Sequence, residues 1–383
     1  RVIKPENSLL RMSREGYKMA PTTFQYFVNT YKPQINAELV AILAAQQNQV
    51  EPDSLAYHDL LDELSIFMAR GGKRLRPLLC LLAHQGYGGS QPEVALKLAA
   101  SQELLHAYLL IHDDIIDGDL QRWGGPNIEA VYQTHFRHQG LDKPAADQAA
   151  RSWALLAGDI CAALSLNVVA VSGLTGPRLQ RRLGLLQQTV LRVLSGELDD
   201  VAAGLLLSSK QHHVQDEHNI LSMYGRKTAS YSFELPLQLG AIAAGAPWVE
   251  LQKLSKLAQP LGIAFQLQDD LLDIFGDSAQ TGKPVLADIR EGKCTVLITK
   301  TLQAVSKSQK TRLLHILGNT NATTAEFNEV KEIIKATGAH KATLKLIRQN
   351  LVEAREALLN TGLSPLAQRQ MQELITSLIV RKF

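Results

Sequence analysis

The chain has 383 residues, 45% of them apolar and 20% charged, which is an ordinary globular composition and allows one large domain or two smaller ones. Its formal net charge of only +3, without a basic tract interleaved with aromatic residues, argues against a nucleic-acid partner. Aromatic residues make up only 5% while Leu and Ala dominate, so packed helices are favoured over sheets. We therefore expect an all-α fold.

Cysteine use and hydropathy indicate the compartment. Cys80, Cys161 and Cys294 are widely spaced among apolar or mixed residues, which predicts neither a disulfide framework nor a zinc site. We see no apolar run near the roughly 18 to 20 residues that a membrane span requires, and no signal-peptide core. We expect a soluble, cytoplasmic protein in which residues 1–20 are a leader or an expression remnant.

The pattern of apolar residues predicts the domain organisation. From about Thr22 onward, apolar residues recur at helical spacing with very little strand-like alternation. Clusters of Gly, Pro and Asn separate the periodic runs, and none of them resembles a domain linker. We predict a single helical domain over residues 21–383.

The segment from Gly71 to Pro77 combines a glycine pair with three cations ahead of an apolar run. Glycine lets the backbone approach an anion closely, and Arg offers a fork of donors suited to phosphate. Lys73 and Arg76 would share a face if the segment is helical, although a basic cluster at a helix start is usually ordinary surface. His106 is a further candidate anion contact, an ordinary partly buried histidine being the alternative.

Two acidic motifs share one pattern, Asp-Asp-x-x-Asp, and each follows an apolar helical stretch. On a helix the first and last carboxylates are four residues apart and the middle and last three apart, so we expect all three on one face. Carboxylates without nearby His or Cys favour a hard ion such as Mg²⁺, which keeps positions open for substrate phosphates. The apolar surroundings argue against a merely solvated surface. The first acidic motif is Asp113, Asp114 and Asp117, and the second is Asp269, Asp270 and Asp273.

Other polar segments are candidates for supporting roles. Lys227, followed by Thr228, lies in a mixed apolar segment from which a lysine can reach a phosphate between the acidic motifs. Lys283 and Lys293 lie in a Gly-rich stretch that would suit a lid, although loops of that composition are merely mobile in most proteins. We interpret the acidic group Glu197 to Asp200 as structural or supporting, and His212, His213 and His218 as a solvated loop.

In this order the segments resemble the trans-isoprenyl diphosphate synthases of the polyprenyl synthetase family, from about Leu64 to Thr299. The motifs that carry the resemblance are GGKRLRP, HDDIIDGD, AGD at 157–159, the Lys227–Thr228 pair, FQLQDDLLDIFGD and GKP…DI…GKCT. The resemblance implies an isoprenoid-synthase-type helical bundle around a deep central cavity, commonly as a homodimer. It also implies head-to-tail condensation of isopentenyl diphosphate with an allylic diphosphate through a Mg²⁺-assisted allylic cation.

The same resemblance assigns roles to residues. The six aspartates of the two acidic motifs would line two facing helices and hold about three Mg²⁺ ions. Thr228 and Gln266 would face the developing cation. Isopentenyl diphosphate would be held by Lys73, Arg76, His106 and Arg122, and the allylic diphosphate would be touched by Lys227 and Lys283.

Product length is expected to depend on the side chains beneath the first acidic motif. Tyr108 and Leu105 precede Asp113 by five and eight residues, which places them about 7.5 and 12 Å deeper along the helix. By the resemblance, a bulky residue at position 108 accompanies short products, so we expect twenty carbons, otherwise fifteen. The alternative is that Tyr108 is only a core residue.

Three departures from the family pattern leave rival functions open. Gln121 replaces one of two consecutive arginines after the first acidic motif, and Glu197 and Leu286 stand where Gln and Gly are common. The lost charge at Gln121 keeps open a non-catalytic accessory subunit of a heteromeric synthase. A class I terpene cyclase is less favoured, because such enzymes lack GGKRLRP and a second complete acidic motif.

Overall fold

The computed structural model describes residues 23–380 except 174, 210–213, 277–286 and 320. In this part the chain is helical apart from one short strand pair, which confirms the all-α expectation. The first elements are α1 (Thr23–Gln47), α2 (Leu55–Arg70), α3 (Leu75–Gly86), α4 (Pro92–Asp117), β1 (Gln121–Arg122), β2 (Gly125–Pro126), α5 (Ile128–His138), α6 (Lys143–Ala170) and α7 (Gly176–Ser208). They are followed by α8 (Glu217–Tyr224), η1 (Gly225–Glu234), α9 (Leu235–Ala244), α10 (Trp248–Phe275), α12 (Ala287–Glu291), α13 (Val296–Ala304), α14 (Lys307–Ile316), α15 (Thr324–Thr337), α16 (Ala339–Leu359) and α17 (Pro365–Val380).

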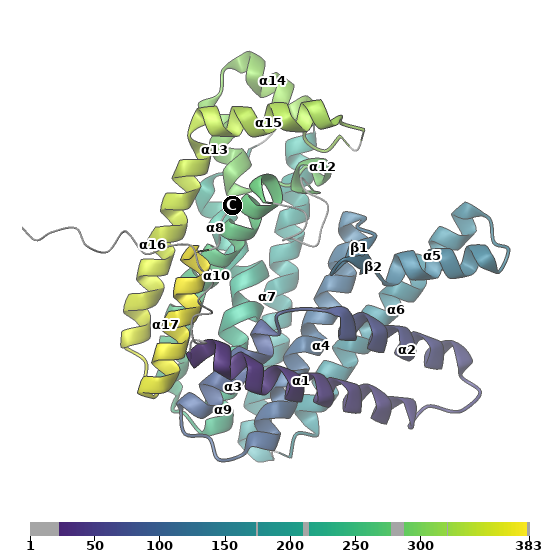
Figure 1. Ribbon diagram of the computed structural model, residues 1–383, viewed down its shortest axis with the longest axis vertical. Helices are drawn as coiled ribbons and strands as arrows, with labels where there is room; N and C mark the ends of the chain where they lie inside the picture. Colours follow the sequence, from purple (N-terminus) through teal and green to yellow (C-terminus); the bar gives the residue numbers. More distant parts are fainter. Residues whose placement is uncertain (1–22, 174, 210–213, 277–286, 320, 381–383) are drawn as a thin grey trace, which may run out of the picture.

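The long helices pack into one bundle (Figure 1). α4 packs against α3 and α6, whereas α10 packs against η1 and α16. Buried apolar side chains from Phe27 in α1 to Leu378 in α17 form one contiguous core. The single domain over residues 21–383 stays a prediction, and the role predicted for residues 1–20 falls outside the described part of the chain.

One helical run changes its winding where polar residues gather. α8, η1 and α9 follow one another without a break, and the ten residues of η1 wind as a π-helix. π-Helical turns occur frequently at functional sites. η1 packs so closely on α10 that a Cβ at Gly262 would collide with Ala229. The close packing brings Lys227 and Thr228 of η1 next to the helix that carries the second acidic motif.

By length and composition, two helices, α4 and α6, are apolar enough to cross a membrane. The expectation that no apolar segment is long enough for a membrane span is therefore wrong. The apolar window of α4 is 67% buried within the bundle, and that of α6 is 44% buried. Core helices of globular proteins pass the same test of length and hydropathy. These two helices therefore give little support to a membrane span.

Candidate active site

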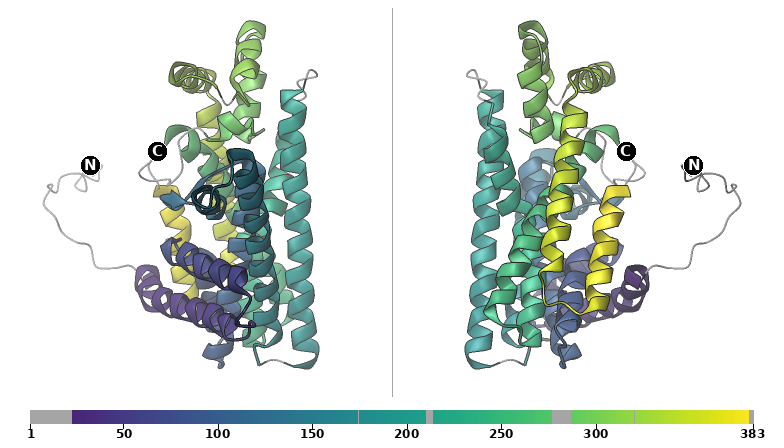
Figure 2. Two further views of the ribbon diagram at one scale, coloured as in Figure 1. Left: turned by 90° about the vertical axis from the view of Figure 1, so that its right-hand side faces the viewer. Right: turned by 90° about the vertical axis from the view of Figure 1, so that its left-hand side faces the viewer.

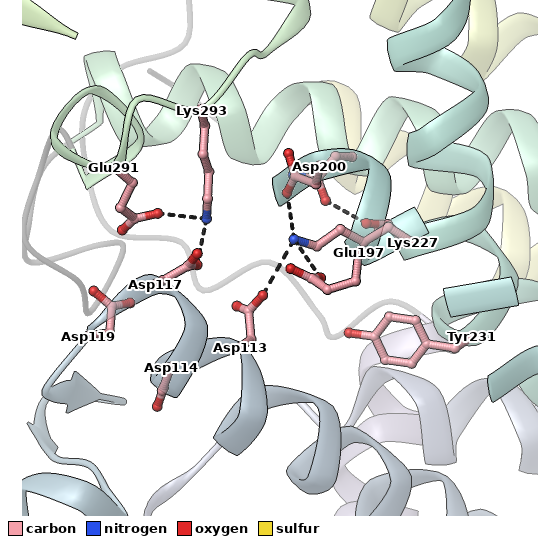
Figure 3. A network of polar contacts seen from close by, with 12 residues as sticks. Asp113, Asp114, Asp117, Asp119, Glu197, Asp200, Lys227, Tyr231, Glu291 and Lys293 are labelled. Atoms are coloured by element: carbon pink, nitrogen blue, oxygen red, sulfur yellow. Dashed lines mark hydrogen bonds and ion pairs between the residues drawn. The ribbon is translucent and has the colours of Figure 1, made fainter. Parts of the chain in front are cut away.

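Both acidic motifs lie at the carboxyl-terminal ends of long helices, because α4 ends at Asp117 and α10 ends at Phe275. The negative end of the helix dipole lies there, so clustered carboxylates are disfavoured unless cations compensate them. Two lysines from other segments do so at the first motif, Lys227 from η1 and Lys293 from the turn after α12 (Figure 3). The first motif is thus the centre of a charge cluster to which α4, α7, η1 and the turn after α12 contribute.

Lys227 joins the first acidic motif to α7. Its Nζ lies 3.4 Å from Asp113, 2.8 Å from Glu197 and 2.6 Å from Asp200. Burial lowers the pKa of Lys227, but the charges of Asp113 and Asp200 outweigh it and hold that pKa well above its usual value. The acidic group on α7, interpreted from the sequence as structural or supporting, therefore surrounds the lysine ammonium.

Lys293 makes the corresponding bridge at the end of α4. Its Nζ lies 2.7 Å from Asp117 and 2.7 Å from Glu291. Burial and the neighbouring charge of Asp113 raise the pKa of Asp117 to about 7, although Lys293 acts in the opposite direction. Burial and crowding among these carboxylates thus hold the pKa of Asp117 above that of a free aspartate.

The three carboxylates of the first motif do not share one face. Asp113 and Asp117 point toward the lysines, whereas Asp114 points away from them (Figure 3). Asp114 is 1% exposed and accepts hydrogen bonds from Arg122 and, at 3.2 Å, from Asn127 Nδ2. Adjacent residues of an α-helix lie about 100° apart around its axis, which the expectation of a single face overlooked. The structure corrects that expectation: Asp114 holds Arg122.

The middle aspartate of the second motif is buried in the same way. Asp270 is 3% exposed and accepts hydrogen bonds from Tyr224 Oη and, at 3.0 Å, from Gln266 Nε2. Burial raises the pKa of Asp270 to about 7, although both hydrogen bonds lower it. Asp273 accepts the backbone N–H groups of residues 287 and 288 at 3.2 and 3.1 Å, and burial raises its pKa to about 6. Both middle aspartates are therefore hydrogen-bonded within the protein.

A cationic cluster lies around His106, earlier on α4. Burial lowers the pKa of His106 well below its usual value, and the charges of Arg76 and Arg122 lower it further. Its ring centroid lies 6.0 Å from that of Tyr231, and its buried Nδ1 has no hydrogen-bond partner among the described residues. A neutral imidazole between two guanidinium groups, with one nitrogen unused, is suited to an anion that brings its own oxygen atoms.

The cations of the GGKRLRP segment have different positions. Arg76 Nη2 donates to Tyr231 Oη at 2.8 Å, and its guanidinium lies over the same ring at 4.4 Å. Arg74 is 3% exposed and forms an ion pair with Glu103 at 2.6 Å, so it is structural. Lys73 is exposed and precedes α3, which begins at residue 75. Lys73 and Arg76 therefore do not share a helix face, contrary to the conditional expectation.

The β1–β2 hairpin places Arg122 in this cationic cluster. Its turn has a positive φ at both central positions, 52° at Trp123 and 74° at the following glycine, as tight hairpins of this kind require. The Trp123 ring centroid lies 4.8 Å from that of Phe67. A Cβ at Gly71 would collide with the indole. Gly71 thus provides the space in which the hairpin packs on the segment that carries Arg76.

Residues 58–334 match the family model for polyprenyl synthetase. The chain belongs to the polyprenyl synthetase family. This polyprenyl synthetase is 34% identical over 266 residues to the short chain isoprenyl diphosphate synthase of Methanocaldococcus jannaschii, covering 69% of the chain and 73% of that protein. It is 31% identical over 329 residues to the geranylfarnesyl diphosphate synthase of Aeropyrum pernix, covering 85% of the chain and 95% of that protein. Its fold matches a geranylgeranyl pyrophosphate synthase of Corynebacterium glutamicum, complexed with isoprenyl diphosphate and magnesium, with a TM-score of 0.84 and 30% identity over 93% of this chain and 99% of that one.

These comparisons confirm the resemblance stated from the motifs and make the synthetase a prenyltransferase of the geranylgeranyl or farnesyl diphosphate synthase type.

Two predicted residues, Thr228 and Gln266, form a bridge between η1 and the second acidic motif. Thr228 Oγ1 donates to Gln266 Oε1 at 2.7 Å, and Gln266 Nε2 in turn donates to Asp270. The amide orientation of Gln266 is thus set by two partners.

The two predicted chain-length residues of the synthetase lie one and two turns below the first motif on α4. The Tyr108 ring centroid is 4.8 Å from that of His112, and Leu105 is 2% exposed in the core. Burial raises the pKa of Tyr108, and the charge of Asp159 on α6 raises it further. Tyr108 is therefore half-buried and close to α6, and its effect on product length stays a prediction.

Some predicted residues of the synthetase fall outside the described part of the chain: Lys283, Leu286, His212 and His213. His218 is exposed in α8, as a solvated residue would be. Sequence reasoning overlooked Tyr224, Tyr231 and Glu291, because nothing in their local sequence distinguishes them from ordinary core or surface residues. Asp288, noted only as part of a motif, is half-buried near Asp273, and desolvation followed by the charge of Asp273 raises its pKa well above the usual value.

The donors available for a metal ion are carboxylates. Among the described residues no group of three His, Cys, Asp or Glu side chains is arranged to hold a metal ion, because the ammonium groups of Lys227 and Lys293 lie among the carboxylates of the first motif. Mg²⁺ commonly takes one or two protein carboxylates and completes its coordination with phosphate and water oxygens. The site therefore fits Mg²⁺ that arrives with a phosphate ligand better than a cage made of protein alone.

Proposed function

We propose that this polyprenyl synthetase is a trans-prenyltransferase that joins isopentenyl diphosphate head to tail to an allylic diphosphate with the help of Mg²⁺. The supporting observation is that α4 carries two anion sites of different kinds. One is the carboxylate–lysine cluster around Asp113 and Asp117, and the other is the cationic cluster around His106. Seven residues separate Asp113 from His106, which corresponds to about 10 Å along the helix axis. Two diphosphates held there can direct their hydrocarbon ends toward each other.

Ionisation of the allylic diphosphate is assigned to the carboxylate–lysine cluster. Mg²⁺, about three ions by family resemblance, would supply the positive charge that makes diphosphate a good leaving group. We propose Asp113, Asp117, Asp269 and Asp273 as its ligands. Lys227 and Lys293 then exchange their carboxylate partners for diphosphate oxygens, and Lys283 contributes a further contact. Asp114 and Asp270 act as positioning residues for Arg122 and Gln266.

Carbon–carbon bond formation takes place between the two anion sites. Arg76, Arg122, His106 and the exposed Lys73 hold isopentenyl diphosphate. Once the bond from the allylic carbon to diphosphate has broken, the isopentenyl double bond attacks the allylic cation, and the departed diphosphate accepts the proton lost from the isopentenyl unit. Thr228 and Gln266 stabilise the cation with their oxygen dipoles. The reaction requires no nucleophilic side chain.

We further propose a product of twenty carbons, otherwise fifteen, with Tyr108 and Leu105 beneath the metal site as its limit. The bulk of Tyr108, held against His112, supports this position. A homodimer is supported by the exposed apolar surface of α6, where Leu155 and Leu156 are 43% and 54% exposed. A groove of about 660 Å³ between α2 and α6 adjoins this surface. A soluble, cytoplasmic enzyme completes the proposal.

The accessory-subunit alternative depends on Gln121 alone. Gln121 is exposed in β1, while Arg122 beside it is 6% exposed and held by Asp114. The cationic cluster around His106 therefore retains its arginine despite the substitution. A terpene cyclase would have no use for a second anion site on α4, and so it is not favoured.

Product analysis by mass spectrometry tests the proposal. The purified chain is incubated with isopentenyl diphosphate, Mg²⁺ and each of the five-, ten- and fifteen-carbon allylic primers, with a chelator control. A metal-dependent product of fifteen or twenty carbons is expected, and Asp113→Asn should abolish most of it. The matched control is Asp147→Asn, a surface aspartate paired with Arg137 and Lys143. A folded protein that elongates no primer would overturn the proposal in favour of the accessory subunit.

A further inference from the structure

Tyr224 is a buried phenol that contacts two separate segments through one oxygen atom. It is the last residue of α8 and is 4% exposed. Its Oη donates to Oδ2 of Asp270 and accepts the backbone N–H of Val296 at 3.3 Å. Because a backbone N–H can only donate, the single hydroxyl proton of Tyr224 is left for Asp270. Tyr224 therefore links the second acidic motif to the chain at Val296.

The bond from Val296 holds the start of a helix. Val296 is the first residue of α13, and Thr295 caps that helix by accepting the N–H of Ile298 at 3.2 Å. The first N–H groups of a helix have no partner within it, and here Thr295 and Tyr224 each accept one. Figure 2 shows the green segment from α12 to α15 at the upper end of the bundle, and α8 packs there against α10 and α13. The start of α13 is thus fixed by a residue from another part of the chain.

Lys293 lies three residues before Val296, so its position depends on how the start of α13 is held. Its Nζ lies 2.7 Å from Asp117 of the first acidic motif and 2.7 Å from Glu291. Residues 294 and 295 are the whole connection between Lys293 and α13. Because a connection of two residues spans only about 7 Å, the lysine cannot move far unless the start of α13 moves as well.

At the other end of the link, both carboxylate oxygens of Asp270 are used within the protein. Oδ2 accepts from Tyr224, and Oδ1 accepts from Gln266 Nε2 at 3.0 Å. The other amide atom of Gln266 is held by Thr228 at 2.7 Å. A continuous path of contacts therefore runs from η1 through Asp270 and Tyr224 to Lys293 and the first acidic motif.

We propose that Tyr224 is a positioning residue that couples the two acidic motifs by holding Asp270 and Lys293 in a fixed spatial relation. Asp269 and Asp273, on either side of Asp270 in α10, then keep the spacing to Lys293 that one metal-bound diphosphate requires. The inference rests on the proposed function, because it concerns the residues that would hold the allylic diphosphate. Phenylalanine would fill the space of Tyr224 but leave the N–H of residue 296 and one carboxylate oxygen without their partner.

Tyr224→Phe tests the proposal, with Tyr87→Phe as the matched control. Tyr87 also donates its hydroxyl to a carboxylate, that of Glu250 at 2.9 Å, but Glu250 lies at the opposite end of α10 from the acidic motif. We expect Tyr224→Phe to raise the KM for the allylic primer about five- to tenfold, the size of one ordinary hydrogen bond. The KM for isopentenyl diphosphate should stay within about twofold, and Tyr87→Phe should leave both constants unchanged. A residue with only a packing role would not separate the two substrates.

A probe that needs no turnover separates this inference from the proposed function. Calorimetry measures the binding of inorganic diphosphate with Mg²⁺, and Tyr224→Phe should bind it about five- to tenfold more weakly than the unaltered protein. In a Lys293→Met background the same substitution should weaken binding much less, because both changes act on one contact.

The outcomes distinguish the two proposals. An unaltered protein that binds diphosphate but elongates no primer overturns only the proposed reaction, and one that binds no diphosphate overturns both. Turnover by the unaltered protein, together with normal KM values and normal diphosphate binding in Tyr224→Phe, overturns the role of Tyr224 alone.

Hydrogen exchange keeps the test decisive if Tyr224→Phe does not fold. In the unaltered protein the amide of Val296 should exchange well below the rate of an unprotected amide, and Mg²⁺ with diphosphate should slow it further. Exchange at the unprotected rate, or a rate that diphosphate leaves unchanged, overturns the proposal.

Discussion

Replacing Asp114 by asparagine separates the two roles that carboxylates have in the first acidic motif. Asp114 is 1% exposed and Arg122 is 6% exposed, so their ion pair is almost free of solvent screening. Asparagine keeps an oxygen that can accept the hydrogen bond but removes the charge. Breaking a buried pair from one side costs about 3–5 kcal/mol, and the retained hydrogen bond places the expected loss near the lower end, about 3 kcal/mol.

This loss converts into a shift of the melting temperature. The unfolding entropy is about 2.1 cal/mol/K per residue, which amounts to about 0.8 kcal/mol/K for 383 residues. A loss of about 3 kcal/mol then lowers the midpoint by about 4 °C. Asp113→Asn is the control within the same motif. Its carboxylate is 22% exposed and shares the Lys227 ammonium with two others, so we expect a change within about 1 kcal/mol.

Kinetics then distinguish positioning from metal binding. With Arg122 less firmly held, Asp114→Asn should raise the KM for isopentenyl diphosphate several-fold and leave the Mg²⁺ concentration for half-maximal rate unchanged. Asp113→Asn should raise the Mg²⁺ concentration for half-maximal rate and leave the KM for isopentenyl diphosphate unchanged. Calorimetric titration with isopentenyl diphosphate in the absence of metal provides a readout besides activity. The reasoning is refuted if Asp114→Asn shifts the Mg²⁺ requirement as Asp113→Asn does and binds isopentenyl diphosphate normally.

Three further outcomes are expected. Tyr108→Ala should lengthen the product by one or more five-carbon units in mass spectrometry, and unchanged product length would leave Tyr108 as a core residue only. Gly71→Ala should displace the Trp123 ring and weaken isopentenyl diphosphate binding at least several-fold; tryptophan fluorescence reports the displacement, and an unaltered spectrum with normal KM would contradict it. The metal-free protein should lose stability to urea as pH rises from about 4 to 7, because Asp117 and Asp270 keep their protons to about 7 when folded but ionise near 3.8 when unfolded. A chelated sample that gains stability over this range would show that other groups dominate.

The sequence alone indicated the all-α class, the family and the two acidic motifs, because these depend on local information. Helical periodicity is visible in the chain, and a repeated acidic motif in apolar surroundings is rare enough to identify a phosphate-binding enzyme. The basic segment and the Lys227–Thr228 pair were found for the same reason. Each is a short run of residues whose chemistry can be stated without knowing what lies opposite.

Tertiary structure decided which of those side chains face one another. The turn of 100° between neighbouring helix positions, together with Arg122 arriving on a hairpin, directs Asp114 away from Asp113. The partners of Lys227 come from α4 and α7, and the ring beneath Arg76 comes from η1, 155 residues later. Contacts between distant segments depend on how helices pack, and helix packing depends on the whole core at once.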